Sequence, residues 1–283
     1  MATLVPNPSF SAIPDYSTNP FVTGLKITVT GNTTFEVSAG AARAQNSNFV
    51  IEFPGNAPSA PAVLTCDITD LGANGVYPKS IASLSLANKT LMGVYIVANS
   101  AGTTGGSLNA GISPAIIVAT GDNFLPSNYD VFRRIGFVYV DDATGNLIPM
   151  SQSGMSNDRT YAINDSVLAL SAGAATTRTA VNLSSGDGVV PPKPDVLVYF
   201  VSIITGNAAN AFGQVFATGN AGSGNPGGTI TPVATGQLGA QFCMPAGQNN
   251  AGAASVDYLV NNAGTALTLA VGGFVDNLDA SVF

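Results

Sequence analysis

The sequence of 283 residues contains no histidine and no tryptophan, and it has only two cysteines. Without histidine, the chain cannot build a Ser–His or Cys–His relay or an imidazole metal site. Charge is scarce as well, since 9% of the residues are charged, against roughly 25% in an average soluble domain. The nine basic residues form no cluster, and the formal net charge is −7. Binding to nucleic acid or to an anionic membrane, which needs grouped Lys or Arg, is therefore not expected.

Long apolar runs are also missing. None approaches the roughly 18 residues that a membrane span requires. The opening MATLVPNPSF has no basic segment followed by an apolar one, so we expect no secretion signal. Cys66 and Cys243 each lie in an apolar run, VLTCDI and AQFCMP. We expect two separate buried thiols, made in a reducing cytoplasm.

The chain is instead rich in short apolar runs. Hydrophobic residues make up 46% of it, with 32 glycines and 17 prolines. Runs such as GLKITVT, FRRIGFVYV and DVLVYFVSIIT alternate or are rich in β-branched residues, and Gly, Asn, Pro, Asp or Ser bound them. This pattern predicts an all-β fold, an antiparallel β-sandwich of the jelly-roll kind. The best helix candidate, residues 78–90, predicts one or two turns at most.

Composition shifts divide the chain into three parts. Residues 1–22 carry four prolines and no periodicity, which predicts an extended N-terminal arm. The polar stretch SQSGMSNDRT separates two β-rich blocks, so we expect one sandwich at 23–155 and a second at 156–283. One large sandwich is the alternative. Gly–Asn turns predict hairpins at 30–32 and at 141–146, the latter joining 132–140 to 147–150.

Carboxylates are the remaining candidates for acid–base chemistry. Two acids about 5–9 Å apart can hydrolyse a glycosidic bond, and the close pairs are Asp67 with Asp70 and Asp141 with Asp142. Aspartate is, however, an ordinary turn residue, and neither pair has the alternating spacing of a calcium loop. The glycine-rich GNAGSGNPGG lacks the Lys–Ser/Thr of a phosphate loop. We expect no catalytic residue, no cofactor and no metal.

Two adjacent arginines, Arg133 and Arg134, stand inside an apolar run. Neighbours on a strand point to opposite faces, so one of them must face inward, and Ile135, Phe137 and Tyr139 should share a face. A buried guanidinium must be paired with carboxylates or carbonyls to offset its desolvation. The pattern therefore predicts a structural tie to a loop or to a neighbouring subunit, with ligand contact as the alternative. Arg43 and Asp141 are further candidates for a tie or an interface.

Four stretches occur in a recognisable order: VTGLKITVTGNTTFEVSAGAARAQNS, DITDLGANGV, TLMGVYIVANS and NFLPSNYDVFRRIGFVYVDDATGNLIPMSQSG. This order resembles a widespread group of tailed-phage and prophage virion proteins of the tail-fibre or tail structural kind. In that group L-P-x-x-Y-x-x-[FY]-R-R-I-G leads into a hairpin with G-[NK]-[LI]-[IL]. The closing LTLAVGGFVDN resembles the group's terminal V-x-G-[YFW]-x-D, with Phe274 as the aromatic. The matching positions in the first half are 24–25, 38–43, 72–76, 94–97, 125–136 and 145–150.

The resemblance implies a non-enzymatic structural protein of a virion, made in the cytoplasm of a bacterial host. It implies self-assembly into a trimer or a larger symmetric array, docking on other virion proteins through the N-terminal arm, and host attachment as a further role. A low-charge, amide-rich surface suits such packing against copies. A capsid decoration, cement or head-fibre protein is the alternative. A further alternative is a virion protein that binds a host-surface glycan or degrades polysaccharide.

Overall fold

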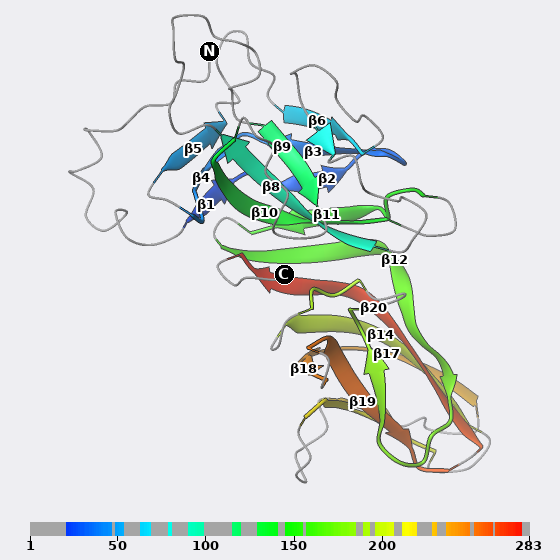
Figure 1. The fold of residues 1–283 in the computed structure, drawn as a ribbon. Helices are drawn as coiled ribbons and strands as arrows, with labels where there is room; N and C mark the ends of the chain where they lie inside the picture. The colour runs from blue at the N-terminus through cyan, green and yellow to red at the C-terminus, as the bar shows by residue number, and fades with distance from the viewer. Residues whose placement is uncertain are drawn as a thin grey trace, which may run out of the picture.

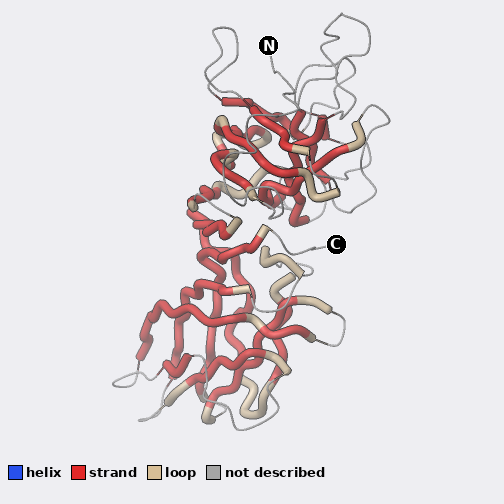
Figure 2. The backbone as a smooth tube through the Cα atoms, turned by 90° about the vertical axis from the view of Figure 1, so that its left-hand side faces the viewer, coloured by secondary structure: helices blue, strands red, loops and turns tan. Residues whose placement is uncertain are grey.

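The computed structural model of the chain describes residues 21–46, 49–53, 63–68, 79–80, 90–98, 115–119, 129–140, 145–154, 157–184, 189–192, 196–206, 211–219, 228–230, 236–249, 252–262 and 264–278. Every regular element in these ranges is a β-strand (Figures 1 and 2). The all-β prediction is confirmed. Residues 1–20 of the predicted arm lie outside the described residues. Within the described part, no helix is long and apolar enough to cross a membrane.

The largest sheet has eight strands and runs through both halves of the chain. Every pairing along it is antiparallel. Its strand order is β17 (Gly236–Pro245), β14 (Leu197–Gly206), β20 (Thr265–Asn277), β12 (Asp158–Gly173), β11 (Met150–Ser153), β2 (Ile27–Val29), β3 (Thr34–Ser38) and β6 (Val63–Asp67). The boundary expected at residue 155 falls between β11 and β12, which are neighbours in this sheet. The division into two domains stays a prediction.

Three smaller sheets complete the fold. One has the order β10 (Val131–Val140), β8 (Thr90–Ala98), β9 (Ala115–Ala119) and β7 (Lys79–Ser80). Another contains β13 (Thr179–Asn182), β19 (Ala254–Val260), β15 (Gly213–Ala217) and β16 (Gly228–Ile230), with β18 (Gly247–Gln248) beside β19. The third contains β1 (Val22–Gly24), β4 (Gly40–Arg43) and β5 (Val50–Phe53). Figure 1 shows the result as an upper and a lower lobe, with β11 and β12 between them.

Each lobe has its own hydrophobic core. The upper core joins residues of the β10 sheet, such as Ile135 and Val138, to Phe35 and Val37 of the large sheet. The lower core joins the other end of the large sheet to the sheet that contains β19. In strand β14, successive side chains point to opposite faces of the sheet. Val198, Phe200 and Ile204 are separated by even numbers of residues, so all three are buried in the lower core.

Of the two predicted hairpins, the first forms and the second is much shorter than expected. β2 and β3 pair across the turn at 30–32, where Thr30 N–H donates to Thr34 O at 3.0 Å. The pairing of 132–140 with 147–150 reduces to one bridge, Val140 with Leu147. β10 instead pairs along its length with β8, and β11 pairs with β12 and β2. Local turn chemistry cannot foresee these longer ladders formed with distant strands.

The helix candidate and the two cysteines differ in part from what the sequence predicts. Of the helix candidate 78–90, residues 79–80 form strand β7 and the segment 81–89 lies outside the described residues. Cys66 is buried as expected, but Cys243 is exposed, because the strand period that buries Met244 turns its neighbour outward. Cys66 and Cys243 are not joined by a disulfide, and they lie on β6 and β17, at opposite ends of the eight-stranded sheet.

Candidate functional site

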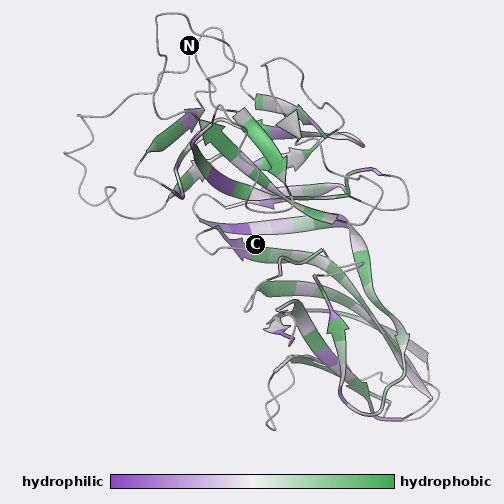
Figure 3. Cartoon of the chain, in the orientation of Figure 1, coloured by the Kyte–Doolittle hydropathy of each residue, from purple (hydrophilic) through white to green (hydrophobic). Residues whose placement is uncertain are grey.

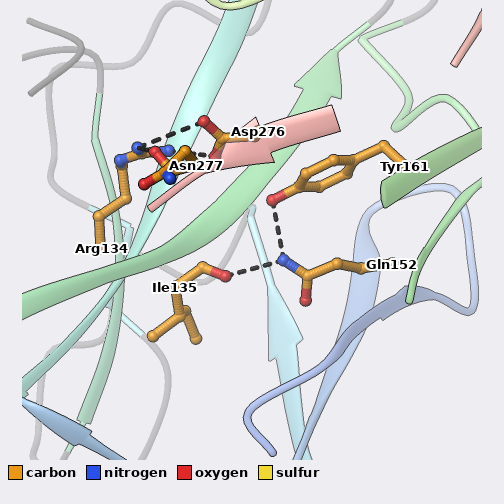
Figure 4. A network of polar contacts seen from close by, with 6 residues as sticks. All are labelled: Arg134, Ile135, Gln152, Tyr161, Asp276 and Asn277. Carbon is orange, nitrogen blue, oxygen red and sulfur yellow. Dashed lines mark hydrogen bonds and ion pairs between the residues drawn. The ribbon is translucent and has the colours of Figure 1, made fainter. Parts of the chain in front are cut away.

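Buried polar side chains gather where β10, β11, β12 and β20 meet, between the two cores. Every one of these side chains is buried. Figure 4 shows four of them and the contacts that join them. We call this cluster the polar junction and define it by five residues: Arg134, Gln152, Arg159, Tyr161 and Asp276.

An ion pair between Arg134 and Asp276 ties the two halves of the chain together. Arg134 Nη1 lies 2.5 Å from Asp276 Oδ2, and Nη2 donates to Oδ1 at 3.4 Å. Nη2 also donates to the backbone carbonyl of Asn277 at 3.2 Å. The guanidinium carbon lies 4.6 Å from the ring centroid of Phe137. The side chains of Arg134 and Asp276 are 3% and 0% exposed, so both charges are removed from water. The attraction between the two charges offsets the free-energy cost of desolvating each of them.

A β-bulge in β10 determines which residues face the junction. Arg134 pairs with Tyr95 and Gly136 with Val94, so Ile135 is an extra residue on the β10 side. Beyond the bulge the faces exchange. Ile135 packs in the upper core, whereas Phe137 belongs to the lower core, together with Tyr139. The expectation that all three share a face is therefore wrong.

Gln152 connects three strands at the bulge. Its Nε2 donates to the carbonyl of Ile135 and to Tyr161 Oη, both at 2.8 Å. Its Oε1 accepts from the backbone N–H of Ile27 at 3.0 Å. A Cβ at Gly136 would lie 2.6 Å from Gln152 Nε2 and collide with Tyr161 Oη. The amide thus occupies a space that only glycine at the bulge leaves open.

Tyr161 stays protonated at this site. Burial raises the pKa of its hydroxyl well above the usual range, and the nearby carboxylate of Asp276 raises it further. Its ring stacks on Phe274, with centroids 4.6 Å apart. A neutral phenol that accepts a hydrogen bond from Gln152 is a packing and orienting group in this setting.

Arg159 extends the junction toward the first strands of the chain. Its Nη2 donates to Gly24 O at 2.8 Å and its Nη1 to Gly154 O at 2.9 Å. On β12 it stands opposite Asp276 in the strand register. Burial lowers the pKa of its guanidinium. The contact with Gly24 binds β12 to the end of β1.

The predicted tie residues are placed as follows. Arg134 lies in the polar junction. Arg133 is buried as well, opposite Ile96 of β8, because β10 is covered on both faces. Arg43 is buried in β4, and Asp141 lies outside the described residues. The structure thus buries both adjacent arginines, where only one was expected to face inward.

The predicted carboxylate pairs are described only in part. Asp67 ends strand β6, while Asp70, Asp141 and Asp142 lie outside the described residues. Among the described side chains, no group of three or more His, Cys, Asp or Glu is placed to hold a metal ion. In the polar junction, the Asp276 carboxylate and the Arg134 guanidinium bind each other. This arrangement suits holding strands together.

Sequence reasoning missed Gln152, Arg159, Tyr161 and Asp276. A signal was present for Asp276, a charged residue at the end of the apolar run GFVDN in a chain with 9% charge. Arg159 lies in SQSGMSNDRT, whose polar character indicated a boundary and concealed the start of strand β12. Which opposite charges meet depends on strand order, which the local pattern does not contain.

Comparison with known proteins identifies no family. No protein-family model matches the sequence, and no curated protein matches it. A carbohydrate-binding module from Cellvibrio mixtus lichenase 5A, in complex with cellotriose, is 14% identical, with 44% of this chain and 86% of that chain covered and a TM-score of 0.22. The Cry4Aa toxin of Bacillus thuringiensis is 10% identical, with coverage of 91% and 52% and a TM-score of 0.19.

A structure of infectious bursal disease virus is similar at 11% identity, with 92% of this chain and 71% of that chain covered and a TM-score of 0.20. At these TM-scores the likenesses carry no argument about fold or function.

Proposed function

We propose that this chain is a non-enzymatic structural subunit of a tailed-phage virion, of the tail or tail-fibre kind. It assembles with copies of itself and docks on the particle, with host attachment as a further role. The polar junction holds its two lobes in one fixed arrangement, which a load-carrying subunit needs.

One observation carries this proposal. Two pieces of the resemblance are R-R-I-G at 133–136 and the terminal V-x-G-F-x-D at 271–276. They are far apart in the sequence, yet Arg134 of the first binds Asp276 of the second. Gly136 and Phe274 both adjoin Tyr161. The residues that carry the resemblance to virion proteins thus include residues in contact between the two halves, and this supports the proposal.

The test is to find the chain in a particle and count its copies. Virions of the phage or prophage that encodes it are purified and examined by mass spectrometry and immunogold labelling. We expect the chain in the particle, at dozens of copies or fewer and on the tail. Absence from virions, together with a purified chain that sediments as a monomer, would overturn the proposal.

The same experiment separates the alternatives. Hundreds of copies on the head would identify a capsid decoration, cement or head-fibre protein. Clearing of host polysaccharide by the purified chain, lost on Asp67→Asn, would identify a depolymerase. Binding of the monomer to a glycan array would identify a carbohydrate-binding protein.

A further inference from the structure

One face of the lower lobe is more apolar than an outer sheet surface normally is. In β14, alternate residues fill the lower core, so Leu197, Tyr199, Val201 and Ile203 point to the opposite side. A sheet with one face in water normally alternates apolar with polar residues. β14 is instead apolar on both faces, the pattern of a strand that is covered on both sides. Figure 3 shows this strand in green and pale colours through the lower lobe.

The strand register extends this surface across four strands. Val201 lies beside Ala270 of β20 and Gln241 of β17, and Ala270 in turn lies beside Leu168 of β12. In another row, Tyr199 lies beside Cys243. We call this surface the apolar face and define it by Leu168, Leu197, Tyr199, Val201, Ile203 and Cys243.

Exposure singles out the same surface. Among the described residues, the large hydrophobic side chains that are exposed are Leu168, at 49%, and Tyr199, at 38%. Both belong to the apolar face. Scattered exposed hydrophobics need no explanation, but their concentration on one continuous sheet surface indicates a binding surface.

Charge indicates what binds there. The defining residues of the apolar face carry no charge, whereas the whole chain has a net charge of −7. Two copies with this net charge repel each other, and a contact made by uncharged side chains adds no further like-charge repulsion. On the apolar face they meet without burying a charge. An uncharged surface also offers nothing to select a basic or an acidic partner.

The size of the face is sufficient for such a contact. Four strands about 4.8 Å apart and about ten residues long, at about 3.3 Å per residue, present roughly 600 Å² per copy, or about 1,200 Å² for two copies, the lower end of specific interfaces. Apolar side chains of β14 lie at the centre, and Gln241 of β17 lies toward the edge, as in an interface with an apolar core and a polar rim.

We propose that a second copy of this chain packs on the apolar face, about a two-fold axis that places the same residues on both sides of the contact. The inference rests on the proposed self-assembly and names the surface that performs it. A two-fold contact of this kind makes dimers, and it is one of the contacts from which a larger array is built.

Sedimentation velocity over a range of concentrations tests the proposal, with the full chain and three single variants. Tyr199→Glu and Leu168→Glu each place a charge on the apolar face at an exposed position. Thr177→Glu adds the same charge at an exposed position between β12 and β13, and serves as the control. We expect the wild type and Thr177→Glu to dimerise. Both face variants should stay monomeric and should melt at the temperature that the wild type shows when it is diluted to monomers.

Cys243 supplies a second measurement. Its thiol is exposed on the apolar face, whereas Cys66 is buried and burial raises the pKa of that thiol far above its usual range. A maleimide reagent should therefore modify Cys243 alone in the folded chain. We expect this reaction to slow as the wild type dimerises, and to keep one rate at all concentrations in Tyr199→Glu.

The possible outcomes distinguish a failure of the apolar face as the contact from a failure of the proposed virion role. Dimers that persist in both face variants, with Cys243 fully reactive, would overturn the apolar face as the contact and leave self-assembly intact. A wild type that is monomeric at every concentration would overturn the two-copy contact. If Cys243 of such a monomer is nevertheless protected within purified virions, another virion protein covers the face and the proposed virion role stands.

Discussion

Arg134 and Asp276 show how a chain that is poor in charge uses two of its charged residues. Both side chains are buried, and each is the partner that makes burial of the other tolerable. Such a pair contributes less to stability than its distance implies, because both ions are desolvated. Its larger effect is on specificity, since any arrangement that separates the two charges is strongly disfavoured.

Replacement of Arg134 by alanine leaves the Asp276 carboxylate buried without its cation. We expect the free energy of unfolding to fall by about 3–5 kcal/mol, the usual cost of breaking a buried pair from one side. Urea denaturation of the purified variant measures it. The matched control is Arg134→Met combined with Asp276→Leu, which should recover much of the loss. If Arg134→Ala alone leaves stability unchanged, the ion pair is not the tie described above.

Gln152→Leu keeps the size of the side chain but removes its hydrogen bonds to Ile135 O, Tyr161 Oη and Ile27 N. We expect a loss of about 2–3 kcal/mol in the free energy of unfolding, because buried polar groups are left without partners. Ser151→Ala, at an exposed position in the same strand, is the control and should change little. Equal stability of the two variants would contradict the role assigned to Gln152.

Cys66 and Tyr161 predict a loss of stability in alkali. Burial raises the pKa of both groups in the folded chain. Below the pKa of the unfolded chain both groups are neutral in either state, so their contribution is fully present. As the pH rises past about 9, the unfolded chain ionises first and becomes favoured. Denaturation midpoints at several alkaline pH values should fall less steeply for Tyr161→Phe than for the wild type; parallel curves would contradict this reasoning.

At the scale of the element, the bulge in β10 is what the sequence did not reveal. FRRIGFVYV predicts a strand at 132–140, and β10, Val131–Val140, begins only one residue earlier. The period of two places Ile135 and Phe137 on one face, but the extra residue moves them to different cores. Gly136 was a signal for the bulge, because glycine inside a strand often marks one.

Gly136→Ala tests the fit between this bulge and the polar junction. The added Cβ would collide with Tyr161 Oη and lie 2.6 Å from both Gln152 Nε2 and Ile27 Cδ1. We expect a loss of about 1–3 kcal/mol, the usual cost of overpacking a core. Tyr161→Phe removes the atom nearest to the added Cβ. We therefore expect the double variant to lose less stability than the sum of the losses in the two single variants. Strict additivity in thermal unfolding would contradict the predicted contact.

The strands themselves were largely predictable, while their neighbours were not. The run DVLVYFVSIIT predicts strand β14 because of its β-branched residues and its length. Nothing in that run says that β14 lies between β17 and β20, or that β11 pairs with β12 and β2. Strand order depends on the packing of both cores together. For the same reason, the sequence showed that a buried Arg134 needs a partner but could not name Asp276.

At the scale of the whole molecule, one sheet belongs to both lobes. Leu278, just past the end of β20, is buried in the upper core, and its N–H donates to Asn157 O at 2.9 Å. Arg134 of the upper lobe binds Asp276 of β20. The two lobes are therefore joined by the hydrogen-bonded strands of one sheet, by Leu278 in the upper core and by the ion pair. We expect the lobes to unfold as one cooperative structure held at the polar junction.

Differential scanning calorimetry of the intact chain tests that central claim most directly. We expect a single unfolding transition in which the calorimetric and van't Hoff enthalpies agree, the signature of two-state unfolding. Arg134→Ala should move this transition to a lower temperature as a whole. Two resolved transitions in the wild type, with only one of them sensitive to Arg134→Ala, would show that the lobes unfold independently and would contradict the account.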